Sequence, residues 1–142
     1  MSPETDVNVE FVEAAMDLIE RGDQQALHDL IDGRVHPEAE LTPLISLGVE
    51  GVYEGPDGVR RFFDDLLDAF EVRYSERELR PVGGGVVLVL CRMGLRGRES
   101  GAEVVQHVGT VYEFEGELLR SARVYEDQSE ATEAAESAGE RA

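Results

Sequence analysis

The sequence predicts an α+β domain in which helices cover one face of a curved antiparallel sheet. The first observation behind this prediction is residues 104–127, which contain two long β-forming runs joined by a tight turn at residues 115–117. The second is the order of the patterns: apolar residues at helical spacing occur early in the chain, and consecutive β-forming runs follow later. Helices are therefore expected to pack against a sheet built mostly from the second half.

Three helices are predicted in the first half. After a loose leader over residues 1–6, apolar residues recur at helical spacing from Val7 to Ile19, and Gly22 ends this helix. Asp23 is a typical N-cap for a second helix over residues 24–31. A turn over residues 53–58 leads into a third helix, whose apolar face consists of Val59, Phe62, Phe63, Leu66, Leu67 and Phe70.

Strands are predicted over residues 39–42, 71–82 and 86–98, before the long hairpin. Residues 44–52 are expected to form an irregular connection, and the three glycines of residues 83–85 a turn. In residues 86–98, arginines at even positions alternate with apolar residues at odd ones, which predicts one face toward the core and one toward solvent or a partner.

The end of the chain is predicted to add one short helix. Ser129 is a suitable cap for a helix running to about Ala135, and residues 136–142 are expected to form a frayed tail. The chain thus divides into a leader, a single domain over residues 7–135 and a tail.

Composition excludes several classes of function. The chain has 31 acidic and 13 basic residues, all of the latter arginine, and its net charge is −18. The negative electrostatic field of such a chain repels nucleic acids and anionic membranes, so neither is expected as a partner. Both a GC-rich genome and adaptation to salt are consistent with this composition.

The beginning of the chain has neither a basic nor an apolar segment of the kind found in secretory signals, so a cytoplasmic location is expected. The single cysteine, Cys91, lies in an apolar run, and a small buried thiol is the expected role. A lone cysteine also excludes an internal disulfide.

Five segments carry a family resemblance when taken in order. They are LIERGD (18–23), YEGPDGVRRFFDDL (53–66), SG (100–101), EGELLRSARVYED (115–127) and SEATEAA (129–135). With them the chain resembles the SnoaL-like family of the nuclear transport factor 2-like superfamily, which includes ketosteroid isomerases and polyketide cyclases. The resemblance implies a cystatin-like α+β barrel: a cone of antiparallel sheet lidded by helices around a mostly apolar pocket. It also implies a homodimer through the convex face of the sheet.

The resemblance argues against ketosteroid isomerase activity. Those enzymes carry a proton-shuttling carboxylate just before a proline on the first strand, where this chain has Thr42 before Pro43. Their two oxyanion donors, a tyrosine and a protonated aspartate, correspond here to Ala15 and Thr110. Since the base and the aligned donors are both replaced, this activity is not expected.

The same matching, with strand alternation, gives an expected pocket lining. It places one face of each of three strands in the pocket: Glu40 and Thr42; Gln106, Val108, Thr110 and Tyr112; and Ser121, Arg123 and Tyr125.

Four of the polar residues are catalytic candidates. Arg123 either binds an anionic or carbonyl-bearing ligand or forms an ion pair with Glu40 or Asp127. Glu40 is a general base if burial raises its pKa, and otherwise a rim carboxylate. Tyr125 either donates to a ligand or forms an aromatic wall. Asp127 lies near the acid/base aspartate of polyketide cyclases, but capping the final helix is the favoured role.

No metal or cofactor is expected. His36, Glu38 and Glu40 alternate in a way that suits metal ligands on one strand face, but Pro37 interrupts them and no further ligand is evident.

Three functional hypotheses follow. The first is a domain that binds a mid-sized, partly apolar small molecule in the pocket, and this is favoured. The second is an enzyme for a cyclase-, isomerase- or hydrolase-type proton transfer on a polyketide- or terpenoid-like substrate, using Glu40, Arg123 and Tyr125. The third is a dimerisation module with a vestigial pocket.

Overall fold

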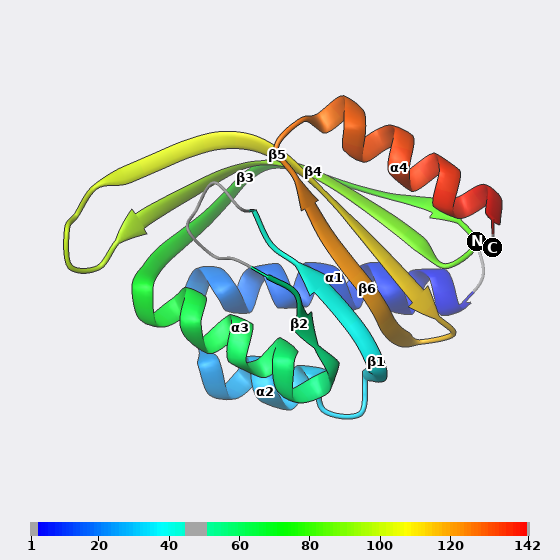
Figure 1. Ribbon diagram of the computed structural model, residues 1–142, viewed down its shortest axis with the longest axis horizontal. Helices are drawn as coiled ribbons and strands as arrows, with labels where there is room; N and C mark the ends of the chain where they lie inside the picture. Colours follow the sequence, from blue (N-terminus) through cyan, green and yellow to red (C-terminus); the bar gives the residue numbers. More distant parts are fainter. Residues whose placement is uncertain (1–2, 45–50, 142) are drawn as a thin grey trace.

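A computed structural model describes residues 3–44 and 51–141 of the chain. In these residues the chain forms four helices around a six-stranded sheet (Figure 1). The elements, in chain order, are α1 (Pro3–Arg21), α2 (Gln24–Ile31), β1 (Val35–Thr42), β2 (Tyr53–Glu54), α3 (Gly55–Ala69), β3 (Phe70–Gly83), β4 (Val86–Gly97), β5 (Glu103–Glu115), β6 (Leu118–Tyr125) and α4 (Gln128–Arg141).

The predicted helices are all present, but the chain ends are more helical than expected. The α1 helix begins at Pro3, so residues 3–6 are its first turn rather than a leader. The last helix continues to Arg141, so residues 136–141 are not a frayed tail. Its buried residues, Ala131, Ala135 and Ala138, recur at helical spacing and pack on the sheet, which holds the helix in place.

The sheet has the strand order β2-β1-β6-β5-β4-β3 and is open, with β2 and β3 at its edges. All neighbouring pairs are antiparallel except β1 and β6, which run parallel, so the predicted antiparallel sheet is mixed at this one pair. The strands β1 and β6 are far apart in the chain, so no hairpin turn forces them to run in opposite directions. Residues 45–50, within the predicted irregular connection, lie outside the described residues.

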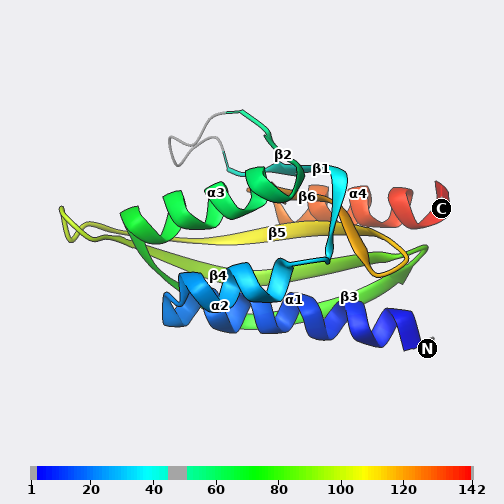
Figure 2. The same cartoon turned by 90° about the horizontal axis from the view of Figure 1, so that it is seen from below.

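Helices cover both faces of the sheet, so the prediction that they cover only one face was wrong for α4, whose buried alanines pack on the outer face. The main core lies between the inner face and the helices α1, α2 and α3. On the outer face, α4 packs on Val86 and Leu88 of β4 and on Val111 of β5. Figure 2 shows α1 running alongside β3 while the long strands curve past it.

The predicted alternation in β4 is confirmed. Cys91, Met93 and Leu95 are buried on the inner face, whereas Arg92 and Arg96 are exposed on the outer face. Nearer the start of β4 both faces are buried, because α4 covers the outer side there. No helix among the described residues is both long and apolar enough to cross a membrane.

Candidate functional site

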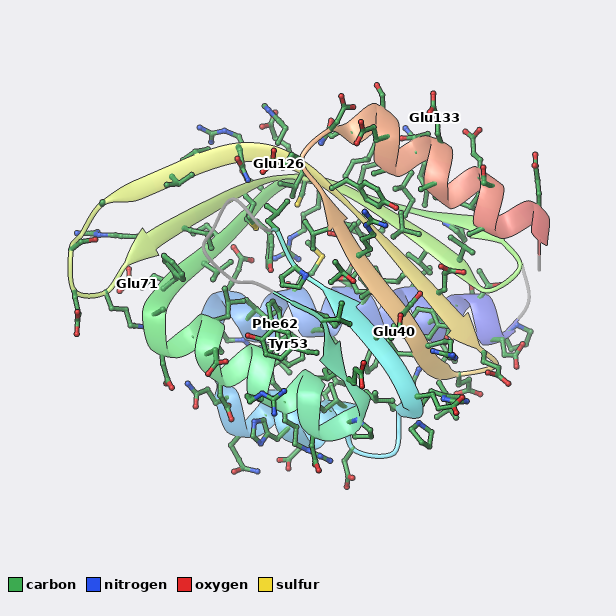
Figure 3. The ribbon with its side chains drawn as sticks, in the orientation of Figure 1. Glu40, Tyr53, Phe62, Glu71, Glu126 and Glu133 are labelled. Carbon is green, nitrogen blue, oxygen red and sulfur yellow. The ribbon has the colours of Figure 1, made fainter. Side chains whose placement is uncertain are left out.

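An apolar cavity of about 100 Å³ lies between the helices and the inner face of the sheet. The helix α1 contributes Phe11, Ala15 and Met16 to its wall, and α3 contributes an aromatic and aliphatic face that includes Phe62, Phe63 and Leu66. These are the positions that the helical periodicity of α1 and α3 places toward the sheet. Near this wall the Phe62 ring packs edge-on against Tyr53, with centroids 5.3 Å apart (Figure 3).

The polar groups of the cavity are three hydroxyls and a thiol. They belong to Tyr74 on β3, Cys91 on β4, and Thr110 and Tyr112 on β5. The described lining residues include no carboxylate, imidazole, guanidinium or amine. The cavity therefore offers hydrogen bonds from neutral groups but no fixed charge.

The pKa values of these groups keep them neutral. Burial raises the pKa of Tyr74 far above its usual range, and nearby Tyr112 and Cys91 raise it further. Burial also raises the pKa of Tyr112, with Cys91 as a smaller cause. The pKa of the Cys91 thiol rises to about 11, again through burial. At neutral pH both phenols keep their protons and can donate a hydrogen bond to a ligand.

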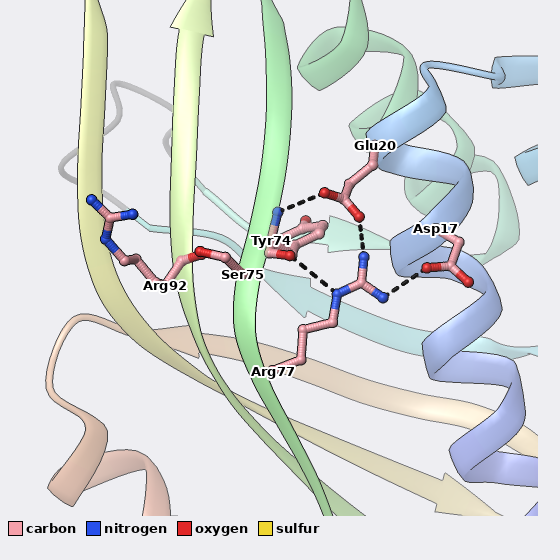
Figure 4. A network of polar contacts seen from close by, with 6 residues as sticks. All are labelled: Asp17, Glu20, Tyr74, Ser75, Arg77 and Arg92. Atoms are coloured by element: carbon pink, nitrogen blue, oxygen red, sulfur yellow. Dashed lines mark hydrogen bonds and ion pairs between the residues drawn. The ribbon is translucent and has the colours of Figure 1, made fainter.

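A charged network fixes the backbone of Tyr74 against α1 (Figure 4). Arg77 pairs with Asp17 at 2.7 Å and with Glu20, and its Nε donates to the Tyr74 carbonyl at 3.3 Å. The Tyr74 backbone N–H donates to Glu20 at 3.1 Å. The register of β3 shifts between Ser75 and Glu78, and this bulge accommodates Arg77 within the strand. The network therefore holds the strand segment that carries one of the cavity hydroxyls.

The β5 part of the predicted lining agrees with the structure. Val108, Thr110 and Tyr112 line the cavity, and so does Ala15, the residue matched to the missing tyrosine of the isomerases. Gln106 is on the same face, opposite Met93, but does not line the cavity. Its Nε2 is buried and has no hydrogen-bond partner among the described residues.

The β6 part of the predicted lining was wrong. Ala122 and Val124 line the cavity, whereas Ser121, Arg123 and Tyr125 point to the outer face. The reason is a β-bulge: Phe114 pairs with Leu119 but Glu113 pairs with Ser121, which leaves Arg120 as an extra residue. One inserted residue moves every later side chain to the other face of the sheet.

The outward β6 residues have partners of their own. Ser121 donates to the Glu113 carboxylate at 3.1 Å, and the Arg123 guanidinium lies 5.0 Å from the centre of the Tyr125 ring. Tyr125 packs against the cluster beneath α4. Arg123 is exposed and forms no ion pair with Glu40, Asp127 or any other residue that the structure describes.

The β1 part of the lining was wrong as well. Leu41 and Pro43 line the cavity, so the intervening Thr42 and the preceding Glu40 face outward. Glu40 is exposed and lies opposite Ser121 in the sheet. Burying the apolar residues on this strand is favourable, whereas burying the Glu40 carboxylate without a partner is costly.

Asp127 is the N-cap of α4. Its carboxylate accepts hydrogen bonds from the backbone N–H groups of Ser129, at 2.7 Å, and Glu130, at 3.1 Å. The favoured capping role is therefore confirmed, and the predicted cap at Ser129 was placed two residues too late.

The His36 segment forms local contacts instead of a ligand cluster. His36 Nδ1 accepts a hydrogen bond from the Glu38 N–H at 2.9 Å, and its Nε2 lies 3.4 Å from Glu115. The described residues contain no group of three or more histidines, cysteines or carboxylates that could hold a metal ion.

Sequence reasoning missed Tyr74 and the inward residues of β6. Tyr74 lies in a loosely alternating run whose first half gave no clear inner face. For β6 a signal was present, because apolar Ala122 and Val124 alternate with polar Ser121 and Arg123.

Solved structures share this architecture. A nuclear transport factor 2-like protein of unknown function from Burkholderia pseudomallei is 18% identical, with a TM-score of 0.69 over 95% of this chain and 98% of that one. A protein proposed to be a SnoaL-like polyketide cyclase, from Jannaschia sp., is 19% identical, with a TM-score of 0.68 and 96% of both chains covered. The epoxide hydrolase/cyclase-like enzyme SalBIII, of salinomycin pyran ring formation, is 20% identical, with a TM-score of 0.68 over 91% of this chain and 96% of that one.

No protein-family model matches the sequence, and no curated protein matches it significantly. At these identities the likeness defines the fold. The protein has the α+β cone fold of the nuclear transport factor 2-like superfamily, with an open sheet in place of a closed barrel. The helices and the inner sheet face enclose the cavity, and Ala15 and Thr110 both line it.

Proposed function

We propose that this protein binds a small, largely apolar molecule that carries a hydrogen-bond acceptor such as a carbonyl. The observation that supports the proposal is the cavity itself, whose wall is apolar except for the neutral groups of Tyr74, Cys91, Thr110 and Tyr112. Apolar pockets with a few placed polar groups are typical small-molecule sites. A vestigial pocket filled by its own side chains is not supported.

The volume limits the ligand part that the cavity can hold. At about 100 Å³ it is below the roughly 300–1,000 Å³ of drug-sized sites, and nearer to the ~150 Å³ of cavities that bind benzene. A ring-sized apolar group therefore fits. A mid-sized ligand, as predicted from the sequence, has to extend beyond this cavity.

The chemistry of the wall supports binding over proton transfer. A general base for neutral pH has to be ionisable near that pH, and no lining residue that the structure describes meets this condition. Glu40 and Arg123, the residues of the enzyme hypothesis, face away from the cavity. We therefore propose that the protein lacks ketosteroid isomerase activity, and that Tyr74 and Tyr112 orient a ligand.

The test compares a ketone with the matching hydrocarbon. Acetophenone and ethylbenzene are titrated into the wild type and into Tyr112→Phe. Tyr125→Phe is the control, because it removes the same hydroxyl group from a residue on the outer face. Losing one neutral hydrogen bond, about 1 kcal/mol, should weaken acetophenone binding about fivefold in Tyr112→Phe alone. Ethylbenzene should bind the three proteins equally. If neither compound binds and native mass spectrometry of fresh protein finds no co-purifying molecule, the proposal is wrong.

We also propose that the protein is a homodimer through the outer face of the sheet. The support is that α4 covers only part of this face, mainly over β4 and β5. The outer residues Ser121 and Arg123 of β6, next to Glu40 and Thr42 of β1, are not part of the α4 cluster. This part of the outer sheet face is therefore available for contact with a second copy of the chain.

A further inference from the structure

A second hollow, of about 390 Å³, lies between the end of α1 and the start of β3. Its position can be followed in Figure 3 from the labelled Glu71 at the beginning of β3. Its wall is mostly charged, unlike that of the apolar cavity. The lining residues are Ile19, Glu20, Arg21, Gly22, Glu71, Val72, Arg73 and Arg98.

Three arginines from three separate segments gather in this hollow, although the chain has a net charge of −18. Arg21 and Arg73 form no ion pair within the described part of the chain, and Arg98 lies 3.9 Å from Glu71. Of the two carboxylates, Glu20 is already bound to Arg77 and to the Tyr74 N–H. The hollow therefore keeps an excess of positive charge.

Arg98 is held in place by its neighbours, and its one ion pair among the described residues is the 3.9 Å contact with Glu71. Its Nε donates to the Leu67 carbonyl at 2.6 Å, which satisfies a carbonyl near the end of α3. Its Nη2 lies near Gly22, where an added Cβ would be 3.6 Å away. A guanidinium fixed in this way loses little freedom when it binds a carboxylate.

The charged hollow adjoins the apolar cavity. Ile19 lines both, and Glu71 of the hollow directly follows Phe70 of the cavity wall. The Ile19 side chain thus lies between the two spaces. A ligand that occupies both spaces therefore has to displace the Ile19 side chain.

We propose that the natural ligand is an amphiphilic carboxylate, with a ring-sized apolar group in the cavity and its carboxylate on Arg21, Arg73 and Arg98. This inference rests on the proposed binding function of the cavity and names the class of its ligand. Guanidinium groups bind carboxylates through paired hydrogen bonds. A singly charged group fits better than a phosphate, because Glu71 flanks the site and repels a second negative charge.

The test uses phenylpropanoate, phenylbutanoate and phenylpentanoate, each beside its methyl ester. Binding is measured by calorimetry with the wild type, with Arg21→Gln/Arg73→Gln, and with Arg92→Gln. Arg92 is the matched control, because it is an exposed arginine on the same sheet that does not line the hollow. Arg21 and Arg73 are exposed too, and urea unfolding checks that the double variant remains folded.

We expect one chain length to bind best, and its acid to bind at least about tenfold more tightly than its ester. The preference for the acid should disappear in Arg21→Gln/Arg73→Gln and persist in Arg92→Gln. Ester binding should be the same in all three proteins, because the ester reports on the cavity alone.

The other outcomes separate this inference from the proposed function. If acids and esters bind equally well, the carboxylate site is refuted while the cavity function stands. If neither binds, both fail. If inorganic phosphate binds as tightly as the acids, or affinity does not depend on chain length, the hollow is an anion site unconnected to the cavity. An equal loss of the preference in Arg92→Gln would assign it to overall charge and overturn the inference.

Discussion

Replacing Gly109 with alanine should loosen α4 from the outer face of the sheet. A Cβ at Gly109 would lie 2.4 Å from the Ala131 Cβ and 3.2 Å from the Leu90 Cδ2. Carbon atoms in contact lie about 3.5–4.0 Å apart, so α4 has to move by roughly 1 Å. Ala131 is fully buried, and strain of this kind costs about 1–3 kcal/mol of the free energy of unfolding.

The assay is urea unfolding, with Gly94→Ala as the matched control. Gly94 lies on the neighbouring strand, and a Cβ there meets only the Arg73 Cβ at 3.8 Å and the Val105 Cγ2 at 3.9 Å, which is ordinary contact. Gly94→Ala should therefore change the free energy of unfolding by no more than about 0.5 kcal/mol.

A compensating variant tests whether the clash is the cause. Adding Ala131→Gly to Gly109→Ala removes the opposing Cβ, so stability should return in part, reduced by about 1 kcal/mol for a glycine within a helix. Measuring Ala131→Gly alone completes the cycle. If Gly109→Ala is as stable as Gly94→Ala, or if the double variant shows no coupling, the close packing of α4 on β5 is refuted.

Two further predictions concern pH and assembly. Burial raises the pKa of Cys91 to about 11, against about 8.5 for an unfolded thiol, so the folded state holds this proton more tightly. The free energy of unfolding should consequently fall as pH rises from about 9 to 11, by up to about 1.4 kcal/mol per pH unit from this group. Cys91→Ala should make this fall with pH less steep. If the wild type and Cys91→Ala lose stability equally steeply, the burial of the thiol is contradicted. For the proposed homodimer, native mass spectrometry should give twice the chain mass of 15.7 kDa. Arg123→Glu should shift the protein toward the monomer, whereas the control Arg61→Glu, on α3, should leave it dimeric. A monomer at micromolar concentration would rule the dimer out.

The local patterns of the sequence were enough for most of the secondary structure. Gly22 and Asp23 mark the boundary between α1 and α2 because a glycine with positive φ ends one helix and a carboxylate caps the next. The alternation of apolar residues and arginines in β4 identified its inner face. The β5 residues that line the cavity were predicted from the same alternation of every second residue, and this worked because no bulge interrupts the pairing of β5 with β4.

The inward residues of β6 were predicted by counting from the hairpin turn, and this failed because β6 is irregular. The extra residue at Arg120 moved Ser121, Arg123 and Tyr125 to the outer face, and two of these, Arg123 and Tyr125, were among the four catalytic candidates. The alternation of Ala122 and Val124 with their polar neighbours carried the correct answer, because burial of apolar area is what selects the face. The local pattern was in this case a better guide than distance from the turn.

The sequence by itself determined the fold class, the helices and the inner faces of β4 and β5, because these depend on hydrophobic periodicity and on capping between near neighbours. Only the tertiary structure decided that Tyr74, Cys91 and Tyr112 share one cavity, that β1 runs parallel to β6, and that three arginines meet at the end of α1. Each of these depends on contacts between residues far apart in the chain. Such contacts are fixed by the packing of whole elements, and no local pattern encodes which elements meet.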